Sequence, residues 1–142
     1  MRPEDRPRFA ALDVIASMQP THATSDRAWV AARLGDARVP WAYAWRSLSD
    51  AGATVVFGSD FPVEEVDPAF GLTAAVMRGG WTPSEAVTLD EAIAAFTAGP
   101  ARAVGEVGVG VVEVGAVADL TLWKVGEPWR AVAPVVGGEV VA

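Results

Sequence analysis

The chain has 142 residues, no cysteine and a formal net charge of −7, and 51% of its residues are hydrophobic. This composition excludes a disordered chain and a disulfide-bonded one, and the acidic balance without a basic stripe argues against nucleic-acid binding. Every apolar run stops well short of the ~18 residues of a membrane span, and the first residues lack the apolar core of a signal peptide, so we expect no membrane partner and a cytoplasmic protein.

The first half of the chain predicts helices that alternate with two short strands. Apolar runs at 14–18 and 54–57 are typical of buried strands. Trp41, Trp45 and Leu48 have the spacing of a core-facing helical stripe. The expected elements are the end of a helix at 8–13, the strand at 14–18, a helix that Ser25 or Asp26 caps and that runs to about Leu34 before Gly35, the helix with the tryptophan stripe up to Gly52, and the strand at 54–57.

Helix start signals dominate the next part of the chain. Asp67 followed by proline predicts a capped helix over 68–78. Residues 82–85 and 88–91 both begin with Thr and end with Glu, which is the spacing of a capping box. The second box opens a predicted helix over 89–97, which the Gly-Pro pair after it ends or bends.

The composition changes after Val104. Residues 105–142 are rich in Val and Gly, and they contain a predicted strand at 119–124. The Gly-Gly pair at 137–138 lies between two short β runs, which indicates a hairpin. We therefore expect two units, 1–104 and 105–142.

Asp60 follows the second predicted strand, in the run FGSDFPV at 57–63. In α/β barrels the chemistry lies at the C-terminal ends of the strands, so a carboxylate at this place is a catalytic candidate. The alternative is a turn-forming aspartate, because Ser-Asp before proline is ordinary turn chemistry.

His22, the only histidine, follows the first predicted strand in the run MQPTH at 18–22. A lone histidine is more often a structural hydrogen-bonding residue than a metal ligand. A histidine and an aspartate at two strand ends, separated by helical sequence, are the arrangement that an α/β metallohydrolase uses. Together, His22 and Asp60 predict one catalytic metal site.

The residues around these two strand ends resemble one known family. In order and spacing, they are similar to the third amidohydrolase family of the amidohydrolase superfamily, and the resemblance extends over nearly the whole chain. The matching segments are 8–12, 15–22, 34–38, 51–53, 58–63, 89–93 and 118–120, with Thr97, Ala101 and Gly115 among them.

The resemblance implies an α/β fold that is the C-terminal portion of a TIM-type (β/α)8 metal-dependent hydrolase barrel. Residues 1–104 would supply its last strands and helices, and residues 105–142 would supply C-terminal strands of a small composite β-sandwich domain. A complete barrel needs roughly 200 residues or more, so the chain is expected to be a fragment.

The resemblance also implies one or two divalent metals, most simply zinc. In the family the ligands are a His-x-His pair on the first strand, a ligand from a middle strand, histidines on the fifth and sixth strands, and an aspartate on the eighth. His22 matches the sixth-strand histidine, and Asp60 matches the eighth-strand aspartate. The chain has no His-x-His pair, so it is expected to begin just after the fifth strand.

Six other side chains are secondary candidates. Acidic side chains close to Asp60 suit a pocket rim, hydroxyls beside the two expected ligands can orient them, and arginines can bind a substrate carboxylate by bidentate pairing. The ordinary alternatives are solvated loop charges, turn-forming hydroxyls and salt bridges. These residues are Glu64 and Glu65 for the rim, Thr21 and Ser59 beside the ligands, and Arg38 and Arg46 for the substrate.

The function implied for the intact enzyme is hydrolysis of a carbon–nitrogen bond, other than a peptide bond, in a small amide-type substrate. Asp60 would act as the general acid–base, and His22 would hold the metal or polarise the carbonyl oxygen. The alternative is a catalytically inert fragment that acts as a partner subunit or interaction module. The isolated chain is expected to be inactive, and to self-associate or to pair with the missing N-terminal half.

Overall fold

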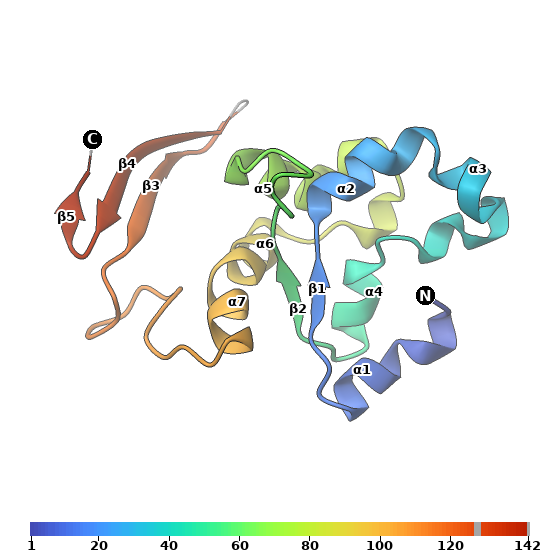
Figure 1. Cartoon of the computed structure of the whole chain (residues 1–142), viewed down its shortest axis with the longest axis horizontal. Helices are drawn as coiled ribbons and strands as arrows, with labels where there is room; N and C mark the ends of the chain where they lie inside the picture. Colours follow the sequence, from blue (N-terminus) through green and yellow to red (C-terminus); the bar gives the residue numbers. More distant parts are fainter. Residues whose placement is uncertain (127–128, 142) are drawn as a thin grey trace.

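The computed structural model describes residues 1–126 and 129–141, and it is an α/β structure. Figure 1 shows helices gathered around two short strands, and a separate sheet of strands beyond α7 toward the C-terminus. The α-helices are α1 (Pro7–Ala11), α2 (Pro20–Ser25), α3 (Val30–Leu34), α4 (Trp45–Asp50), α5 (Pro68–Met77), α6 (Leu89–Phe96) and α7 (Ala98–Ala103). The strands are β1 (Ala16–Met18), β2 (Val55–Phe57), β3 (Leu120–Lys124), β4 (Arg130–Val136) and β5 (Glu139–Val140). The 3-10 turns are η1 (Pro3–Asp5), η2 (Asp26–Ala28), η3 (Asp36–Trp41), η4 (Arg78–Gly80) and η5 (Pro83–Glu85).

β1 and β2 are parallel neighbours, with Ser17 opposite Val56. Both predicted strands are present, although each has only three residues. Their direct pairing contradicts the placement of His22 on the sixth strand and Asp60 on the eighth strand of a barrel. A seventh strand would separate those two, because consecutive strands lie side by side in such a barrel. The strand before His22 is instead the immediate neighbour of the strand before Asp60.

Several helix bounds differ from the predicted ones. Asp26 does not start a long helix, because it has helical backbone angles (φ −77°, ψ −14°) at the C-terminal end of α2. The helix after it is a separate one that begins at Val30. Trp41 lies in η3, outside α4, which begins at Trp45. The resulting helices are short, and none in the described ranges is long and apolar enough to cross a membrane.

Helix caps were predicted correctly where the local sequence alone determines them. The Asp67 side chain accepts a backbone N–H of the first turn of α5 at 2.8 Å. Thr88 and Glu91 form both hydrogen bonds of the predicted capping box at the start of α6. Thr82 makes no capping bond, and its φ of +45° is in the left-handed region. Its hydroxyl accepts hydrogen bonds from a buried arginine instead.

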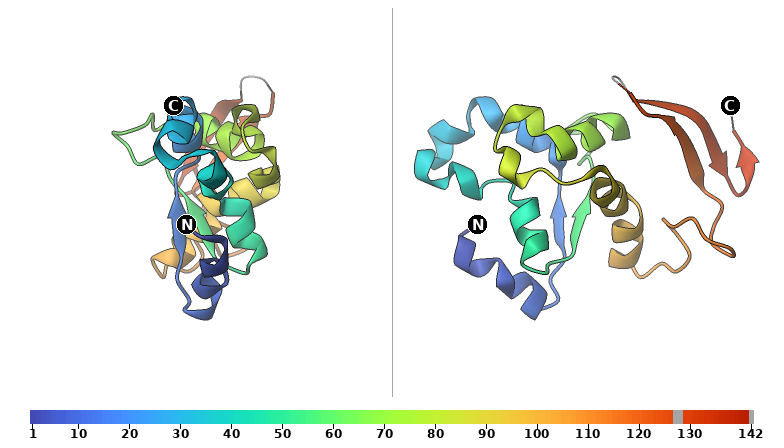
Figure 2. Two further views of the ribbon diagram at one scale, coloured as in Figure 1. Left: turned by 90° about the vertical axis from the view of Figure 1, so that its right-hand side faces the viewer. Right: turned by 180° about the vertical axis from the view of Figure 1, so that it is seen from behind.

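The main core lies between the strand pair and helices α4, α5 and α6. Trp45 packs edge-on against Phe57, with ring centroids 5.6 Å apart, and the Phe96 ring lies 5.4 Å from that of Phe57. A Cβ added at Gly71 of α5 would lie 2.6 Å from the Phe96 ring, so α5 and α6 approach more closely than a larger residue permits. Figure 2 shows the strand pair at one side of this body, with α4 and most other helices beside it.

β3, β4 and β5 form an antiparallel sheet in that order, which confirms the predicted strand and hairpin. Gly137 and Gly138 form the turn with φ values of +59° and +87°, which glycine adopts without a steric penalty. The described residues place no second sheet against this one. The sandwich therefore stays a proposal.

The segment between α7 and β3 connects the helical body to this sheet. A Cβ at Gly110 would lie 2.6 Å from the Thr97 backbone, so this segment contacts the end of α6 closely. Trp129, just before β4, packs against the main core. The last helix ends at Ala103, close to the proposed boundary after residue 104.

We predict that the isolated chain self-associates. Both outer edges of the β1–β2 pair are unpaired among the described residues, and the C-terminal sheet exposes apolar side chains such as Leu122, Val132 and Val140. Analytical ultracentrifugation is expected to show oligomers, and the chain is expected to bind the dye ANS. A monodisperse monomer that melts cooperatively and binds no dye would contradict this prediction.

Candidate functional site

The C-terminal ends of β1 and β2 lie next to each other at the same end of the strand pair. Because the strands are parallel, the segments that follow them leave from the same side. The Gly58 N–H donates to the Met18 carbonyl oxygen at 3.2 Å, which joins the two ends. α2 begins two residues after Met18, and His22 is its third residue. This geometry brings His22 and Asp60 together.

His22 Nε2 lies 3.7 Å from Asp60 Oδ2. The His22 side chain is 22% exposed and the Asp60 side chain 54% exposed, so the pair stands at the surface of the described body. The Nε2 atom itself is buried and has no hydrogen-bond partner within the described ranges. An imidazole nitrogen without a partner, close to a carboxylate, is free to bind a further group.

Asp60 has an unusual backbone conformation. Its φ is +61°, in the left-handed region that aspartate adopts more readily than most residues but still at a steric cost of about 1 kcal/mol. Its carbonyl oxygen accepts the Val63 N–H at 2.8 Å, and the Ser59 hydroxyl accepts the Phe61 N–H at 3.2 Å. Left-handed non-glycine residues are frequent at functional sites. Because its hydroxyl accepts the Phe61 N–H, Ser59 shapes the turn that presents Asp60. This is the alternative role considered for Ser59.

A cavity of about 280 Å³ lies next to this turn. Thr21 and Ser59, the neighbours of His22 and Asp60, line it, and so does Glu65, whereas Glu64 does not. The Thr21 hydroxyl oxygen is buried without a hydrogen-bond partner in the described part of the chain. The rest of the lining is mostly apolar or turn residues: Phe57, Gly58, Val66, Asp67, Pro68, Gly71, Phe96 and Pro100.

Neither of the two candidate substrate-binding arginines lines that cavity. Arg46 forms a bidentate ion pair with Glu91, in which Nη1 donates to Oε1 at 2.8 Å, and its Nε donates to the Ala86 carbonyl oxygen at 3.2 Å. Arg38 is exposed, and its Nε donates to the Leu34 carbonyl oxygen at the end of α3. The salt-bridge alternative thus describes Arg46, and helix capping describes Arg38.

The Arg46–Glu91 pair predicts a dependence of stability on acidic pH. The Arg46 hydrogen bond, with those from Thr88, lowers the pKa of Glu91 to about 2. Since this pKa is lower in the folded than in the unfolded chain, ionised Glu91 stabilises the fold above pH ~4.3, and this stabilisation is lost as the pH falls toward 2. Glu91 is partly exposed, so we expect a contribution of only about 1 kcal/mol.

Urea unfolding at a series of pH values measures this effect. The free energy of unfolding is expected to fall less steeply below pH ~4.3 in Glu91→Gln than in the unmodified chain. Asp90→Asn, the adjacent acidic residue of the same helix turn, is the matched control. Equal slopes in Glu91→Gln and in the unmodified chain would show that the ion pair does not contribute to acid sensitivity.

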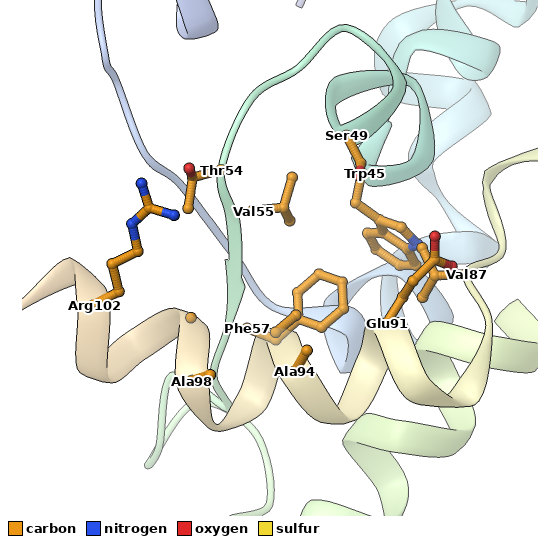
Figure 3. A pocket seen from close by; sticks show the side chains of 12 residues that line it. Trp45, Ser49, Thr54, Val55, Phe57, Val87, Glu91, Ala94, Ala98 and Arg102 are labelled. Atoms are coloured by element: carbon orange, nitrogen blue, oxygen red, sulfur yellow. The ribbon is translucent and has the colours of Figure 1, made fainter. Parts of the chain in front are cut away.

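Figure 3 shows a second cavity, of about 300 Å³, between α4, β2, α6 and α7. Trp45, Val55 and Phe57 form much of its apolar lining, and Glu91 and Arg102 are its charged side chains. Neither His22 nor Asp60 lines it. Glu91 is paired with Arg46, and neither Glu91 nor Arg102 lines the cavity beside Asp60, so this cavity adds no group to the candidate site.

The sequence analysis missed a buried polar network next to α2. Arg78 has no exposed surface, and it donates to the Tyr43 carbonyl oxygen, while the Tyr43 hydroxyl donates to Asp26. The only sequence signal was an arginine close to Trp81, because cations and aromatic side chains commonly pair. Neither the burial of Arg78 nor its distant partners could be read from that spacing.

His22 and Asp60 fit part of a divalent metal site. An imidazole nitrogen and a carboxylate oxygen are ordinary zinc ligands, and the buried Nε2 without a partner is suitably placed for such a role. Catalytic zinc sites normally use three protein ligands. The described ranges contain no group of three histidine, aspartate or glutamate side chains that could hold a metal ion. A complete site therefore needs ligands beyond these residues.

Comparisons with known proteins agree with the resemblance seen in the sequence. The family described as "Amidohydrolase family" matches residues 1–142. The chain is similar to the putative amidohydrolase YtcJ of Bacillus subtilis, with 36% identity over 102 residues, which are 66% of this chain and 19% of that protein.

Several solved structures are also similar, including the following two. An uncharacterized metal-dependent hydrolase from Pyrococcus furiosus matches with a TM-score of 0.76 and 34% identity, over 83% of this chain and 25% of that one. A triazine hydrolase variant matches with a TM-score of 0.69 and 25% identity, over 99% of this chain and 33% of that one. The chain thus spans about a fifth to a third of the length of these proteins.

Proposed function

Because this chain belongs to the amidohydrolase family, we propose that it supplies part of the active site of a metal-dependent hydrolase that cleaves carbon–nitrogen bonds other than peptide bonds. The observation that carries this proposal is the approach of His22 to Asp60 at the paired strand ends. The metal-dependent and triazine hydrolases among the similar structures support the reaction class. The proposed substrate is a small molecule with an amide-type bond.

In this proposal His22 Nε2 and an Asp60 carboxylate oxygen would hold a divalent metal, most simply Zn²⁺. A bound metal of this kind lowers the pKa of a water molecule to about 7 and so supplies the nucleophile. The Asp60 carboxylate would accept the proton of the attacking water and return it to the leaving amine. His22 either stays a ligand or polarises the carbonyl oxygen of the substrate.

Because the strands before His22 and Asp60 are direct neighbours, the pairing of these two residues in one site depends on their distance and not on family strand positions. We propose that residues 1–104 are the last part of a (β/α) barrel and that 105–142 contribute strands to a β-sandwich. The remaining strands and ligands would come from a polypeptide segment outside these 142 residues.

One observation favours the alternative of an inert partner or interaction module. The described residues supply two metal ligands where a catalytic zinc site uses three. On this alternative the apolar surfaces of the chain serve association, and Asp60 is a turn residue. Metal binding by the chain itself distinguishes the two proposals.

We expect the isolated chain to bind Zn²⁺ weakly, and His22→Ala to weaken the binding further, because two protein ligands leave half of a tetrahedral site to water. Isothermal titration calorimetry measures the affinity. Arg38→Ala, which changes an exposed residue away from the pair, is the control and is expected to bind as the unmodified chain does. If His22→Ala binds zinc as well as the unmodified chain, the metal role of His22 is wrong.

A further inference from the structure

α2 carries His22, but little within the helix holds it in place. The helix has six residues, and Gln19 at its N-terminal end makes no side-chain capping hydrogen bond. A helix this short is unstable by itself, because the few hydrogen bonds it forms do not offset the entropic cost of its first turn. The position of His22 relative to Asp60 therefore depends on contacts from the rest of the chain.

The C-terminal end of α2 is anchored through Asp26. The Asp26 N–H donates to the carbonyl oxygen of His22 itself. The Asp26 carboxylate oxygen Oδ2 accepts a hydrogen bond from the hydroxyl of Tyr43, which is 17 residues further along the chain. Burial, and then the adjacent Asp26 carboxylate, raise the pKa of the Tyr43 hydroxyl, so this hydroxyl keeps its proton and donates it to Asp26 at physiological pH.

Tyr43 is in turn fixed from the other side. Its φ is +52°, a left-handed conformation that a bulky residue keeps only when the surrounding structure imposes it. Its carbonyl oxygen accepts a hydrogen bond from Arg78 Nη1 at 3.0 Å, and its ring meets the Trp81 ring edge-on at 6.0 Å. Both its main chain and its side chain are thus held by the segment that follows α5.

Arg78 is the buried end of this series of contacts. Its guanidinium lies 4.0 Å from the ring centroid of Trp45 and 5.4 Å from that of Trp81. Its Nε donates to the Trp81 carbonyl oxygen at 3.2 Å and to the Thr82 hydroxyl at 3.1 Å. Burial lowers the pKa of Arg78 to about 10, so the side chain remains a cation at neutral pH. A planar side chain with five donors suits this task, and lysine could not replace it.

A second contact joins the same two segments. The Arg27 side chain, in the turn directly after α2, donates to the carbonyl oxygen of Gly79, the residue after Arg78. The end of α2 is therefore attached at two points to a segment about 50 residues away. These attachments lie directly after the helix that presents His22, and they touch neither His22 Nε2 nor Asp60.

We propose that Arg78, Tyr43 and Asp26 form a hydrogen-bonded relay that positions α2 so that His22 meets Asp60. This proposal rests on the proposed function, because the relay matters for activity only where His22 belongs to the hydrolase site. Tyr43 and Asp26 are positioning residues, because they act through the helix backbone. The hydroxyl of Tyr43 is the link that can be removed with the least change in packing.

The test uses the fact that the chain has one histidine and one tyrosine. The Cε1–H group of His22 gives one ¹³C–¹H NMR signal that no other histidine overlaps, and carbethoxylation of its ring by diethylpyrocarbonate can be followed without interference from another histidine. Tyr43→Phe is expected to broaden or split this signal and to raise the carbethoxylation rate several-fold, because α2 opens more often when one attachment is lost. The melting temperature of the Tyr43→Phe variant is expected to fall by only a few degrees, about the effect of one lost hydrogen bond.

Two variants of Asp26 separate positioning from a general loss of stability. Asp26→Asn keeps a side-chain oxygen that can accept the Tyr43 hydrogen bond, so the His22 signal should resemble that of the unmodified chain. Asp26→Ala removes the acceptor and should change the His22 signal as Tyr43→Phe does. This variant therefore tests the relay even if Tyr43→Phe fails to fold. Thr97→Val removes a side-chain hydrogen bond to the Ile93 carbonyl oxygen, far from α2 in sequence, and is the matched control.

The relay is wrong if Tyr43→Phe and Asp26→Ala leave the His22 signal and its carbethoxylation rate unchanged, or if Thr97→Val disturbs them as strongly. Zinc titration of the His22 signal in the unmodified chain distinguishes a failure of the relay from a failure of the proposed metal role of His22. If zinc does not move the His22 signal but Tyr43→Phe does, the relay is supported and the metal role of His22 is refuted. In a chain that does bind zinc through His22, Tyr43→Phe should weaken that binding by about 10-fold.

Discussion

Replacing Asp60 by asparagine is expected to lower kcat by about 10²–10⁴-fold in a protein in which the remaining barrel strands are supplied. Asparagine keeps the size of the side chain and an oxygen that can contact a metal, but it cannot accept the proton of the attacking water. The left-handed backbone at Asp60 also tolerates asparagine, so the turn should stay intact. The loss of activity would then report the missing proton acceptor and not a change of fold.

A hybrid chain makes this experiment practicable. The part of the Bacillus subtilis relative that lies outside the matched region can be joined to this chain, and metal-dependent hydrolysis of simple N-acyl or N-formyl amines can be measured. Ser59→Ala is the control, because its hydroxyl accepts one backbone hydrogen bond in the turn and should cost little activity. A hybrid that hydrolyses substrate equally well with asparagine at position 60 would make the aspartate a turn residue and refute its catalytic assignment.

Trp45→Ala is expected to lower the free energy of unfolding by about 3–5 kcal/mol. Trp45 has no exposed surface, and its ring contacts both the Phe57 ring and the buried Arg78 guanidinium. Alanine would enlarge the cavity that Figure 3 shows, which Trp45 lines, and it would remove an aromatic face from a desolvated cation. A typical domain is stable by only about 5–15 kcal/mol, so this variant should be largely unfolded at moderate temperature.

Trp29→Ala is the matched control for this prediction. The Trp29 side chain is exposed, at 46%, and its substitution is expected to change the free energy of unfolding by less than about 1 kcal/mol. Urea unfolding followed by far-UV circular dichroism avoids the change in tryptophan fluorescence. If the two variants unfold at the same urea concentration, the cluster around Trp45 does not form the stabilising core.

Short-range signals in the sequence were sufficient for several elements. Asp67 and Thr88 were recognised as helix caps because each cap bonds a backbone N–H within the next three residues. The two strands were found from runs of apolar residues, and the hairpin at the C-terminal end from its two glycines. The same reasoning placed His22 and Asp60 at strand ends, because only the order of strand and polar residue along the chain was needed.

Long-range contacts decided what those signals could not. The sequence did not show that β1 and β2 are direct neighbours, and the family pattern suggested a strand between them, because pairing partners are chosen by the whole sheet. Thr82 has the local pattern of a cap, but the buried guanidinium of Arg78 takes its hydroxyl, since an unpaired cation in the core would cost more than a lost cap. Arg46 looked free to bind substrate until the fold brought Glu91, 45 residues away, within bonding distance. A cap depends on neighbours in sequence, whereas a buried charge takes its partners from whichever segments the tertiary fold places around it.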